Sequence, residues 1–450
     1  MATLAKSVPK KKSVDRESVF AAEFERHKAL RVIAVISILA LTIMILVGLF
    51  APGLDYSLVQ APTLPVDSAA FVDELEPLVN SKITKNNQIE VIKNGSNFYE
   101  AELQAMREAR HSINIEAYIF HKGRVTDDVL RVLLERAKAG VRINLVVDAL
   151  GSLSTRKRYF KQLKEAGGHV EWYHPLRLHK WFVSNNRTHR EITIVDGTTA
   201  FVGGAGYADW WRYASKDEPA WRDTMVRLQG DAVRGLQGAF VENWLESSGE
   251  ILDGSDYFPP LAAHPGSSTA LVVTSTPSSG GSTRARVLFQ TLIAAAKKNI
   301  DITTPYFLPD RSMRDELIRA VKRGVSVRII VPGKHSDHAV TRSSGRSAYG
   351  DLLRAGANIF EYDASMIHAK IMIVDRAWGV VGSTNLDSRS FGINDEVNVA
   401  VLDPQLANRL DEDFTDDLQR AAHITLEDWQ KRSALERAFE WVGWVIERQQ

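Results

Sequence analysis

The most regular feature of the chain is an order of strand-like and helical segments that occurs twice. ARHSINIEAYIF (109–120) is rich in apolar and β-branched residues, and VLRVLLERAKAGVRINLVVD (129–148) continues with apolar residues at helical spacing and a second β-branched run. The same order returns in AKKNIDITTPYF (296–307) and ELIRAVKRGVSVRIIV (316–331). Strands that alternate with helices predict an α/β sandwich in each half, with a largely parallel sheet.

The two copies continue to resemble each other towards their ends. A helix end with glycine and a further strand follow in LKEAGGHVEWY (163–173) and LLRAGANIFEY (352–362). Each copy then reaches a histidine segment, RTHREITIVDG (187–197) or MIHAKIMIVDR (366–376). The chain is therefore predicted to contain two related halves.

Composition marks the boundaries between these parts. Pro, Gly and Ser collect in 252–269 and 274–283, which is typical of linkers and loops. The second stretch is expected either to line the mouth of a site or to be a plain surface loop. The predicted parts are a basic N-terminus (1–31), a transmembrane helix (32–51), a linker (52–87), a first half (88–251), a linker (252–285), a second half (286–425) and an amphipathic C-terminal helix (426–450).

A long apolar run near the start predicts a membrane anchor. In VIAVISILALTIMILVGLFA (32–51) the only polar side chains are Ser37 and Thr42, and a helix of this length rises about 30 Å, the thickness of a hydrocarbon core. A buried core helix and a cleaved signal peptide are the alternative interpretations. Core helices are seldom apolar all round, and no clean small-x-small cleavage site follows, so we predict an uncleaved signal anchor.

Charge on the two sides of this run predicts its orientation. Residues 1–31 are rich in Lys and Arg, whereas residues 52–81 have neither and carry several acids. Because basic residues stay on the cytoplasmic side, we expect a single-pass membrane protein with a cytoplasmic N-terminus. Everything after the anchor would lie on the periplasmic or extracellular side.

The C-terminal segment 426–450 offers a second candidate for membrane contact. Apolar residues recur at helical spacing, with charges opposite them and three tryptophans, Trp429, Trp441 and Trp444. Such a helix can lie in a membrane interface or pack on the domain or a partner. Trp181 and the pair Trp210–Trp211 are further candidates for lipid contact.

Composition and charge exclude some classes of protein. Lys and Arg number 56 against 55 Asp and Glu, so the chain lacks the basic excess that is usual in a dedicated nucleic-acid binder. It has no cysteine, which excludes disulfides and thiolate metal sites. We expect no nucleic-acid partner, no metal and no cofactor. The oligomeric state stays open.

The histidine segments carry the candidate chemistry. In the second copy His368 and Lys370 are two residues apart, so on a strand they share a face. GSTNLDSRS (382–390) then supplies Ser383 and Asn385, which suit a phosphate. Gly204 and Gly206 take the corresponding places after the first histidine, so we expect phosphate contacts there too.

The paired segments resemble the phospholipase D superfamily, which has two H-x-K-x-x-x-x-D motifs per chain. Residues 88–425 are similar to bacterial cardiolipin synthases of this type, for example in FVGGAGYADWW, TPYFLPD and NDEVNVAVLD. The resemblance implies two halves about a pseudo-twofold axis and one cleft that contains both His189 and His368. One histidine would attack a phosphodiester to give a phosphohistidine, and the other would protonate the leaving alcohol.

The resemblance also names the expected reaction and the further site residues. It implies a membrane-anchored phosphatidyltransferase that makes cardiolipin from two phosphatidylglycerol molecules, with release of glycerol. Phosphodiester exchange needs no nucleotide. The expected catalytic residues are His189, Glu191, Asp196, His368, Lys370 and Asp375. Asp223 and Glu396 occupy equivalent places after the two motifs, and each either orients a histidine or is a structural carboxylate.

The first motif departs from the family pattern at two positions. Glu191 stands where lysine is expected, and Gly206 stands where asparagine often lies. Arg190 would not replace the lysine, because strand alternation turns it to the opposite face. A cation could come instead from Arg177, His179, Lys180 or Arg187 in the preceding segment, which is otherwise a solvated or lipid-facing loop.

The carboxyl group of Glu191 beside His189 would favour imidazolium, since opposite charges about 4 Å apart attract by roughly 4 kcal/mol at an effective dielectric of 20. That favours His189 as acid and base and His368 as nucleophile, whereas the resemblance favours the first histidine as nucleophile, so the roles stay open. We expect an active but asymmetric transferase. The alternatives are a phosphodiester hydrolase of lipid or nucleic acid, and a non-catalytic phospholipid-binding protein on a degenerate site.

Overall fold

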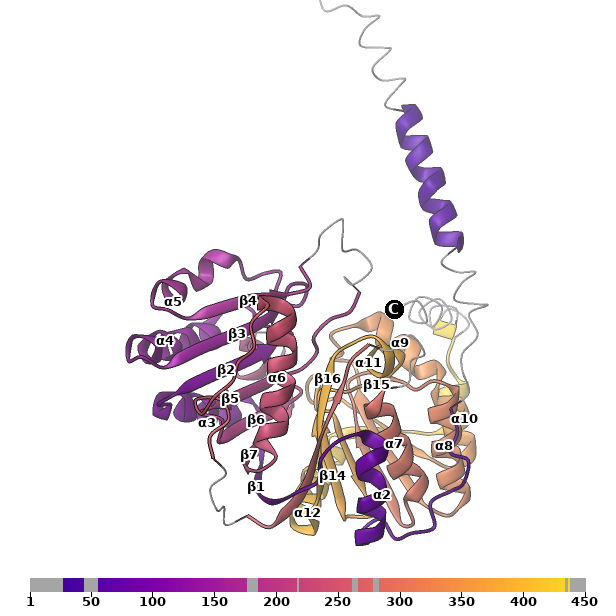
Figure 1. The fold of residues 1–450 in the computed structure, drawn as a ribbon. Helices are drawn as coiled ribbons and strands as arrows, with labels where there is room; N and C mark the ends of the chain where they lie inside the picture. The colour runs from indigo at the N-terminus through magenta and orange to yellow at the C-terminus, as the bar shows by residue number, and fades with distance from the viewer. Residues whose placement is uncertain are drawn as a thin grey trace, which may run out of the picture. The chain divides into compact units, whose positions relative to one another are not determined.

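The structure is a computed structural model that describes residues 27–43, 56–175, 185–216, 218–260, 266–277, 283–433 and 436–437. The chain divides into a small N-terminal unit that ends at Gly53 and a main unit that extends over Leu54–Arg448. Both parts appear in Figure 1.

The main unit is built on one large sheet with helices on both faces (Figure 1). Among the described residues, fifteen strands pair in the order β17-β12-β11-β9-β13-β14-β16-β8-β1-β7-β6-β5-β2-β3-β4. The strands before the centre are β1 (Thr84–Lys93), β2 (Ser112–Ala117), β3 (Arg142–Asp148), β4 (His169–Tyr173), β5 (Ile192–Val195), β6 (Thr199–Gly203) and β7 (Thr224–Gly230). The later ones are β8 (Ser268–Ser275), β9 (Asn299–Thr303), β11 (Ser326–Pro332), β12 (Asn358–Tyr362), β13 (Ile371–Val374), β14 (Trp378–Gly382), β16 (Glu396–Leu402) and β17 (Ala421–Ile424), and β10 (Phe307–Leu308) pairs separately with β15 (Leu386–Asp387).

The helices follow the repeat that the sequence predicts. Those of the first half are α3 (Gly95–Glu108), α4 (Arg124–Lys138), α5 (Lys161–Glu165) and α6 (Val233–Ser248), with short 3₁₀ turns at Lys157–Phe160 and Asp209–Trp211. The second half is covered by α2 (Ala69–Val79), α7 (Arg284–Ala295), α8 (Arg311–Lys322), α9 (Ala339–Ser347), α10 (Tyr349–Ala355), α11 (Ser388–Gly392), α12 (Pro404–Leu418) and α13 (Leu426–Gln430).

The strand order confirms two related halves. Outward from the β1–β8 pair, the first half runs β1-β7-β6-β5-β2-β3-β4 and the second runs β8-β16-β14-β13-β9-β11-β12, with β17 added at the edge. Corresponding strands therefore take corresponding places on the two sides of the seam. This arrangement puts the two strands that follow the histidines, β5 and β13, at matching positions.

The expectation of a largely parallel sheet is wrong for most of the strands. Only β2-β3-β4 and β9-β11-β12 pair in parallel, and the other pairs of the sheet are antiparallel. The parallel strands are those joined by helices. The strands after each histidine return through a tight hairpin instead, where Asp196 and Asp375 have left-handed backbone angles, φ 52° and 53°.

The hydrophobic core joins the halves. One cluster contains Val226, Leu236 and Phe240 from the first half together with Leu410 and Phe414 from α12 of the second. A core shared in this way makes the halves one cooperative body, because separating them would expose apolar surface.

The expected linkers contain ordered structure. Within residues 52–87, α2 buries Phe71 and Leu75 in the core of the second half, and Nε1 of Trp378 donates to the Val66 carbonyl at 2.7 Å. In the second linker, Tyr257 is buried, and β8 lies at the centre of the sheet. Residues 278–282, in the loop that was a candidate for the site mouth, lie outside the described residues.

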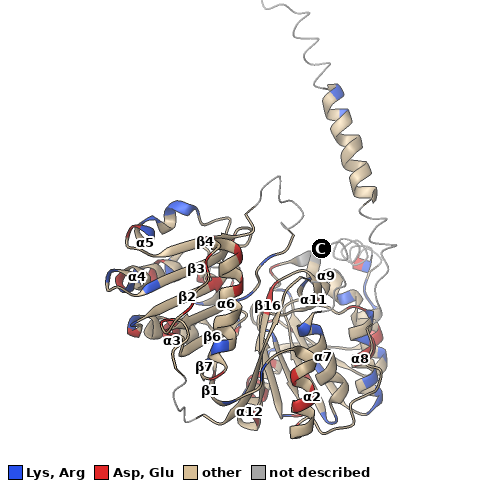
Figure 2. Ribbon diagram, in the orientation of Figure 1, with Lys and Arg blue, Asp and Glu red and all other residues tan. Residues whose placement is uncertain are grey.

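The N-terminal unit contains a helix of residues 27–43 whose side chains are all exposed. Its basic residues, Lys28 and Arg31, lie at one end (Figure 2). Across the parts of the chain that the structure describes, no helix is long and apolar enough to cross a membrane. The remainder of the expected anchor, residues 44–51, lies outside those parts.

The C-terminal segment is described only at its start. There Trp429 donates through Nε1 to the Arg346 carbonyl at 2.7 Å, and a Cβ on Gly350 would meet its ring. Trp429 thus packs on the second half. Trp441 and Trp444 lie outside the described residues.

Candidate active site

Two backbone crossings between the halves position the histidines. The His189 amide donates to the Asp395 carbonyl at 2.8 Å, and the His368 amide donates to the Arg222 carbonyl at 2.7 Å. Thr188, before His189, pairs with Asp395, and Ile367, before His368, pairs with Arg222. In both crossings the next residue of the other half is an acid, Glu396 or Asp223. The regular strands begin only afterwards, at Ile192 and Ile371, so the expectation that each motif opens with a strand is wrong by a few residues.

The first crossing pairs His189 with Glu396. Nδ1 of His189 lies 3.0 Å from Oε2 and 3.1 Å from Oε1 of that carboxylate. Glu396 is buried and is held by the hydroxyl of Ser383 and by Asn394 Nδ2 at 3.4 Å. With Nδ1 directed at the carboxylate, Nε2 of His189 is the nitrogen left for proton transfer.

The second crossing pairs His368 with Asp223 in the same way. Nδ1 of His368 lies 3.1 Å from Oδ2 of Asp223, and the indole Nε1 of Trp211 donates to that oxygen at 3.0 Å. The Thr224 amide donates to Oδ1 at 2.8 Å. Asp223 and Glu396 therefore orient the histidines, and each acts on the histidine of the opposite half.

Lys370 lies against His368, as their spacing predicts. Its Nζ is 2.8 Å from Nδ1 and 3.2 Å from Nε2 of the ring, and it donates to the carbonyls of His368 at 3.0 Å and Gly204 at 3.2 Å. Lys370 is buried. It places a cation at the histidine that the second half contributes.

Burial and charge set the ionisation of this group. Burial, helped by the charge of Lys370, holds the pKa of His368 below its usual range. Burial also lowers the pKa of Lys370, although Asp223 and Glu191 oppose the shift. Burial acts to raise the pKa of Asp223, but the hydrogen bond to His368 and the charge of Lys370 outweigh it and leave that pKa lowered.

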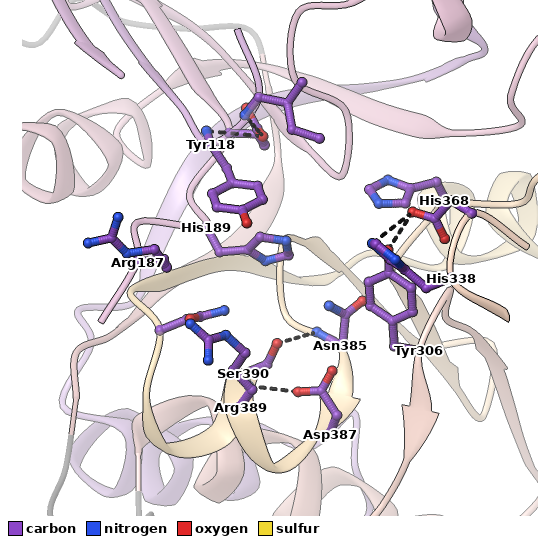
Figure 3. Close-up of a pocket in the computed structure, with 14 residues that line it drawn as sticks. Tyr118, Arg187, His189, Tyr306, His338, His368, Asn385, Asp387, Arg389 and Ser390 are labelled. Carbon is purple, nitrogen blue, oxygen red and sulfur yellow. Dashed lines mark hydrogen bonds and ion pairs between the residues drawn. The ribbon is translucent and has the colours of Figure 1, made fainter. Parts of the chain in front are cut away.

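Both histidines line one cavity of about 150 Å³ between the halves, as the cleft predicted for the motifs requires. Figure 3 shows them with Tyr118, Tyr306 and Asn385 around the space. The other lining residues are Ile119, Arg187, Glu191, Asp337, His338, Asp387, Arg389, Ser390 and Asn394. Across the described residues, no group of three or more His, Asp or Glu is arranged to hold a metal ion.

Glu191 is placed differently from the sequence prediction. Its Oε1 accepts the amides of Tyr118 at 3.2 Å and Ile119 at 3.4 Å, and the carboxyl group that pairs with His189 is that of Glu396. Burial raises the pKa of Glu191 well above its usual range, with Lys370 opposing the shift. The predicted pairing of Glu191 with His189 is therefore not what this geometry gives.

The structure places two of the arginines that were considered as replacements for the missing lysine. Arg190 points away, as strand alternation predicts, and is buried against the Ala239 carbonyl at 2.7 Å and Glu242 at 2.7 Å. Arg187 does line the cavity, but its guanidinium lies 3.3 Å from Asp148. The other candidates, Arg177, His179 and Lys180, lie outside the described residues, as does Trp181.

Asp196 and Asp375 are not in the cavity, and their expected catalytic role is wrong. Each follows the strand whose other end is next to a histidine. Asp196 accepts the amides of Arg110, His111 and Ser112 at 2.7–3.1 Å, and Asp375 accepts those of Lys297, Lys298 and Asn299 at 2.7–3.0 Å. These carboxylates fix the hairpins to the start of β2 and β9.

The residues expected to contact a phosphate differ in where the structure places them. Asn385 lines the cavity, and its Oδ1 is buried without a partner among the described residues. Ser383 is instead occupied by Glu396 and by the Val397 amide at 3.1 Å. Gly204 contributes its carbonyl to Lys370, Gly206 gives Glu191 room, and neither glycine is among the residues that line the cavity.

Several site residues were missed in the sequence. Tyr118 and Tyr306 both line the cavity, and their rings lie 5.4 Å from His189 and 6.3 Å from His368. When 109–120 is aligned with 296–307, Tyr118 and Ile119 fall opposite Pro305 and Tyr306, so repetition between the halves located the segment but not the tyrosine itself. Trp211, a candidate for lipid contact in the sequence, is instead buried beside His368 and donates to Asp223.

Comparisons with known proteins agree with this geometry. The family described as "Cardiolipin synthase, PLD-like domain" matches residues 103–218 and 289–418. The major cardiolipin synthase ClsA of Bacillus subtilis is 36% identical over 352 residues, which cover 78% of this chain and 72% of that protein. A cardiolipin synthase of Oceanobacillus iheyensis is 36% identical over 351 residues, with the same coverage.

A solved structure extends the likeness to the fold. The crystal structure of phosphatidylserine synthase from Haemophilus influenzae superposes with a TM-score of 0.62 and covers 83% of this chain and 99% of its own. At 15% sequence identity, that likeness concerns the fold alone.

Proposed function

This chain belongs to the phospholipase D-like family of cardiolipin synthases, and we propose that its two crossed histidines transfer a phosphatidyl group between two phosphatidylglycerol molecules through a covalent intermediate. The chain is a phosphatidyltransferase of cardiolipin synthesis. The proposal assigns the nucleophile and the acid and base of the transfer to particular residues.

His368 is the proposed nucleophile. Its lowered pKa keeps the ring neutral near pH 7, and a neutral imidazole has the lone pair that attack on phosphorus needs. Nε2 bonds to the phosphorus of the first phosphatidylglycerol while the bond from phosphorus to the glycerol oxygen breaks. Lys370, at 3.2 Å from that nitrogen, supplies positive charge where the phosphate gathers negative charge.

His189 is the proposed acid and base. Glu396 lies against Nδ1 and so aims Nε2 at the cavity. Its proton goes to the departing glycerol oxygen, so that free glycerol leaves. His189 then takes the proton of a glycerol hydroxyl on the second phosphatidylglycerol, and that oxygen displaces His368 from phosphorus to give cardiolipin.

The observation that carries this proposal is the pair of histidine–carboxylate contacts. Each histidine has a buried acid of the other half on Nδ1, at 3.0 Å for His189 and 3.1 Å for His368. A degenerate binding site would have no need for two complete pairs, because a phosphate could be bound by the cations alone.

We further propose that residues 32–51 anchor the enzyme in the membrane, with the N-terminus in the cytoplasm. The support is the exposed apolar surface of the helix of 27–43, where Val35 and Ile38 are each more than half exposed. The basic residues before the apolar run favour this orientation. Protease added to sealed membrane vesicles of each orientation would tell which side the main unit occupies.

The test of the reaction uses the full chain in mixed micelles with labelled phosphatidylglycerol, beside His189→Ala and His368→Ala. Cardiolipin and glycerol from the wild type, and from neither variant, are the expected products by mass spectrometry. A labelled phosphatidyl group trapped on the protein at early times, by quenching with denaturant at mildly alkaline pH where the bond from phosphorus to histidine nitrogen survives, should be present in wild type and absent in His368→Ala. Phosphatidic acid as the main product would overturn transfer, and a label retained in His368→Ala but not in His189→Ala would reverse the two roles.

A further inference from the structure

Glu191 is the one position where the first motif replaces the family's cation by an acid, and the structure shows an unusual carboxyl group there. Oε1 accepts the two amides of Tyr118 and Ile119, at 3.2 and 3.4 Å. Oε2 is buried and has no partner among the described residues. The side chain is only 4% exposed, yet it lines the cavity between the histidines.

The two oxygens therefore differ in what they can do. Oε1 accepts hydrogen bonds from two amides, so it corresponds to the carbonyl oxygen of a carboxylic acid, which can only accept. Oε2 is then the atom that carries a proton when the group is neutral, and a hydroxyl can donate. The raised pKa that burial gives Glu191 agrees with this assignment.

The substrate makes the neutral form still more favourable. A phosphodiester is negatively charged, so an ionised carboxylate in the same cavity would repel it, whereas a carboxylic acid would donate to it. The charged and titratable groups that act on Glu191 or feel its charge are Lys370, Asp223, Tyr99, Tyr118 and Tyr207. Lys370 favours ionisation, and Asp223 opposes it.

We propose that Glu191 works as a neutral carboxylic acid whose Oε2–H donates a hydrogen bond to a non-bridging oxygen of the substrate phosphate. It is then a catalytic residue that takes the place of the lysine in the first motif. The inference rests on the proposed transfer reaction and assigns one more contact in the same cavity. It makes the first half-site an adapted site rather than a decayed one.

The second departure of the motif fits the first. A Cβ on Gly206 would lie 2.8 Å from Oε1 of Glu191 and 2.5 Å from the Ile119 carbonyl. Only glycine leaves the carboxyl group in the position where it receives both amides. Asn385 takes the matching place in the second half, where the motif residue is Lys370. The two departures from the family pattern, Glu191 and Gly206, are therefore coupled, because the glycine leaves the space that the carboxyl group occupies.

The first test compares Glu191→Gln with Glu191→Ala in the full-length enzyme. Glutamine keeps an acceptor for the two amides and an N–H donor in place of the hydroxyl, so we expect kcat/KM within about tenfold of wild type. Alanine removes the donor, and we expect a loss on the order of 100-fold. If glutamine is as damaging as alanine, an ionised carboxylate is required and the proposal is overturned, as it is if both variants match wild type.

The pH profile gives a readout that a merely structural role would not move. Because Glu191 must be protonated to donate, its ionisation should add one step to the alkaline fall of kcat/KM, beside the loss of the His189 proton that the acid step needs and of the Lys370 proton, and this added step should be missing in Glu191→Gln. The matched control is Glu102→Gln. Glu102 is a buried acid outside the cavity whose pKa burial raises to about 8, and its replacement should leave the alkaline limb in place.

Two measurements without turnover separate this inference from the proposed reaction. The infrared difference spectrum of wild type minus Glu191→Gln near pH 7 should show a protonated-carboxyl band over the background of other buried acids such as Glu102, and the absence of this difference band would overturn the proposal. In a His368→Ala background, Glu191→Ala should weaken binding of phosphatidylglycerol in micelles, and an unchanged affinity would also overturn it. A wild type that makes no cardiolipin would instead overturn the transfer reaction, whatever these two results are.

Discussion

Nδ1 of His189 lies 3.0 Å from a carboxylate oxygen of Glu396, a residue 207 positions later in the chain. The matching contact joins His368 to Asp223 at 3.1 Å across 145 positions. Each half therefore supplies a histidine to the site and an acid to the other half's histidine. Because neither half contains a complete histidine–acid pair, activity requires both halves to be joined through the central sheet.

The crossed acids should be essential for the rate and not for the fold. Glu396→Gln keeps the size of the side chain but removes the carboxylate that fixes the orientation and tautomer of His189, and we expect kcat to fall on the order of 10⁴-fold, as when the acid of a serine-protease triad is neutralised. Micelle assays of cardiolipin formation measure this effect. Asp395→Asn is the matched control, since its buried carboxylate accepts from Tyr173 at 2.6 Å and not from a histidine. Equal losses in both variants would contradict the assignment.

His368 should stay neutral at a lower pH than an ordinary histidine does. Its pKa lies below the ordinary value of a histidine, so the acid limb of kcat/KM should lie below about pH 6.5. Lys370→Met removes a neighbouring cation that lowers the pKa, so the limb should move to higher pH as the total rate drops. A proton NMR titration, with His368 assigned from the spectrum of His368→Ala, checks the same shift directly. If the acid limb of kcat/KM does not move in Lys370→Met, the charge of Lys370 does not lower the pKa of His368.

Asp196 and Asp375 should matter for stability rather than for catalysis. Each accepts three backbone amides at the far end of a strand from its histidine. Asp196→Asn tolerates the left-handed backbone but gives up the charge-assisted bonds, and we expect it to lower the free energy of unfolding by roughly 3 kcal/mol. Denaturant unfolding followed by assay of the folded protein measures both quantities. Asp375→Asn should behave alike, and a loss of kcat with unchanged stability would contradict the structural role.

Gly206 should tolerate no side chain. In Gly206→Ala the new Cβ would clash with the Ile119 carbonyl and with Glu191, so we expect both activity and melting temperature to fall. Gly238→Ala is the control, because a Cβ there meets no atom within 4 Å and alanine favours the helix α6 that contains it. Its melting temperature should be unchanged or slightly higher. A harmless Gly206→Ala would mean that Glu191 does not need the space.

The sequence by itself determined the repeat, the two histidines, the lysine beside the second one and the departure at Glu191. These are local properties: apolar spacing predicts strands and helices, and two-residue spacing puts His368 and Lys370 on one side. The same rule turned Arg190 away from the site, and its contacts with Ala239 and Glu242 confirm this.

Only the tertiary structure decided which acid serves which histidine and what Glu191 does. The acids were recognised as equivalent, but sequence distance gives no reason to pair His189 with Glu396 across the molecule. That pairing follows from the two backbone crossings between the halves. Likewise, the sequence placed Glu191 near His189, but its two amide donors and its burial come from Tyr118 and Ile119 on another strand end. Ionisation and hydrogen-bond partners depend on the groups that surround a side chain in space, and a linear pattern fixes only the neighbours along the chain.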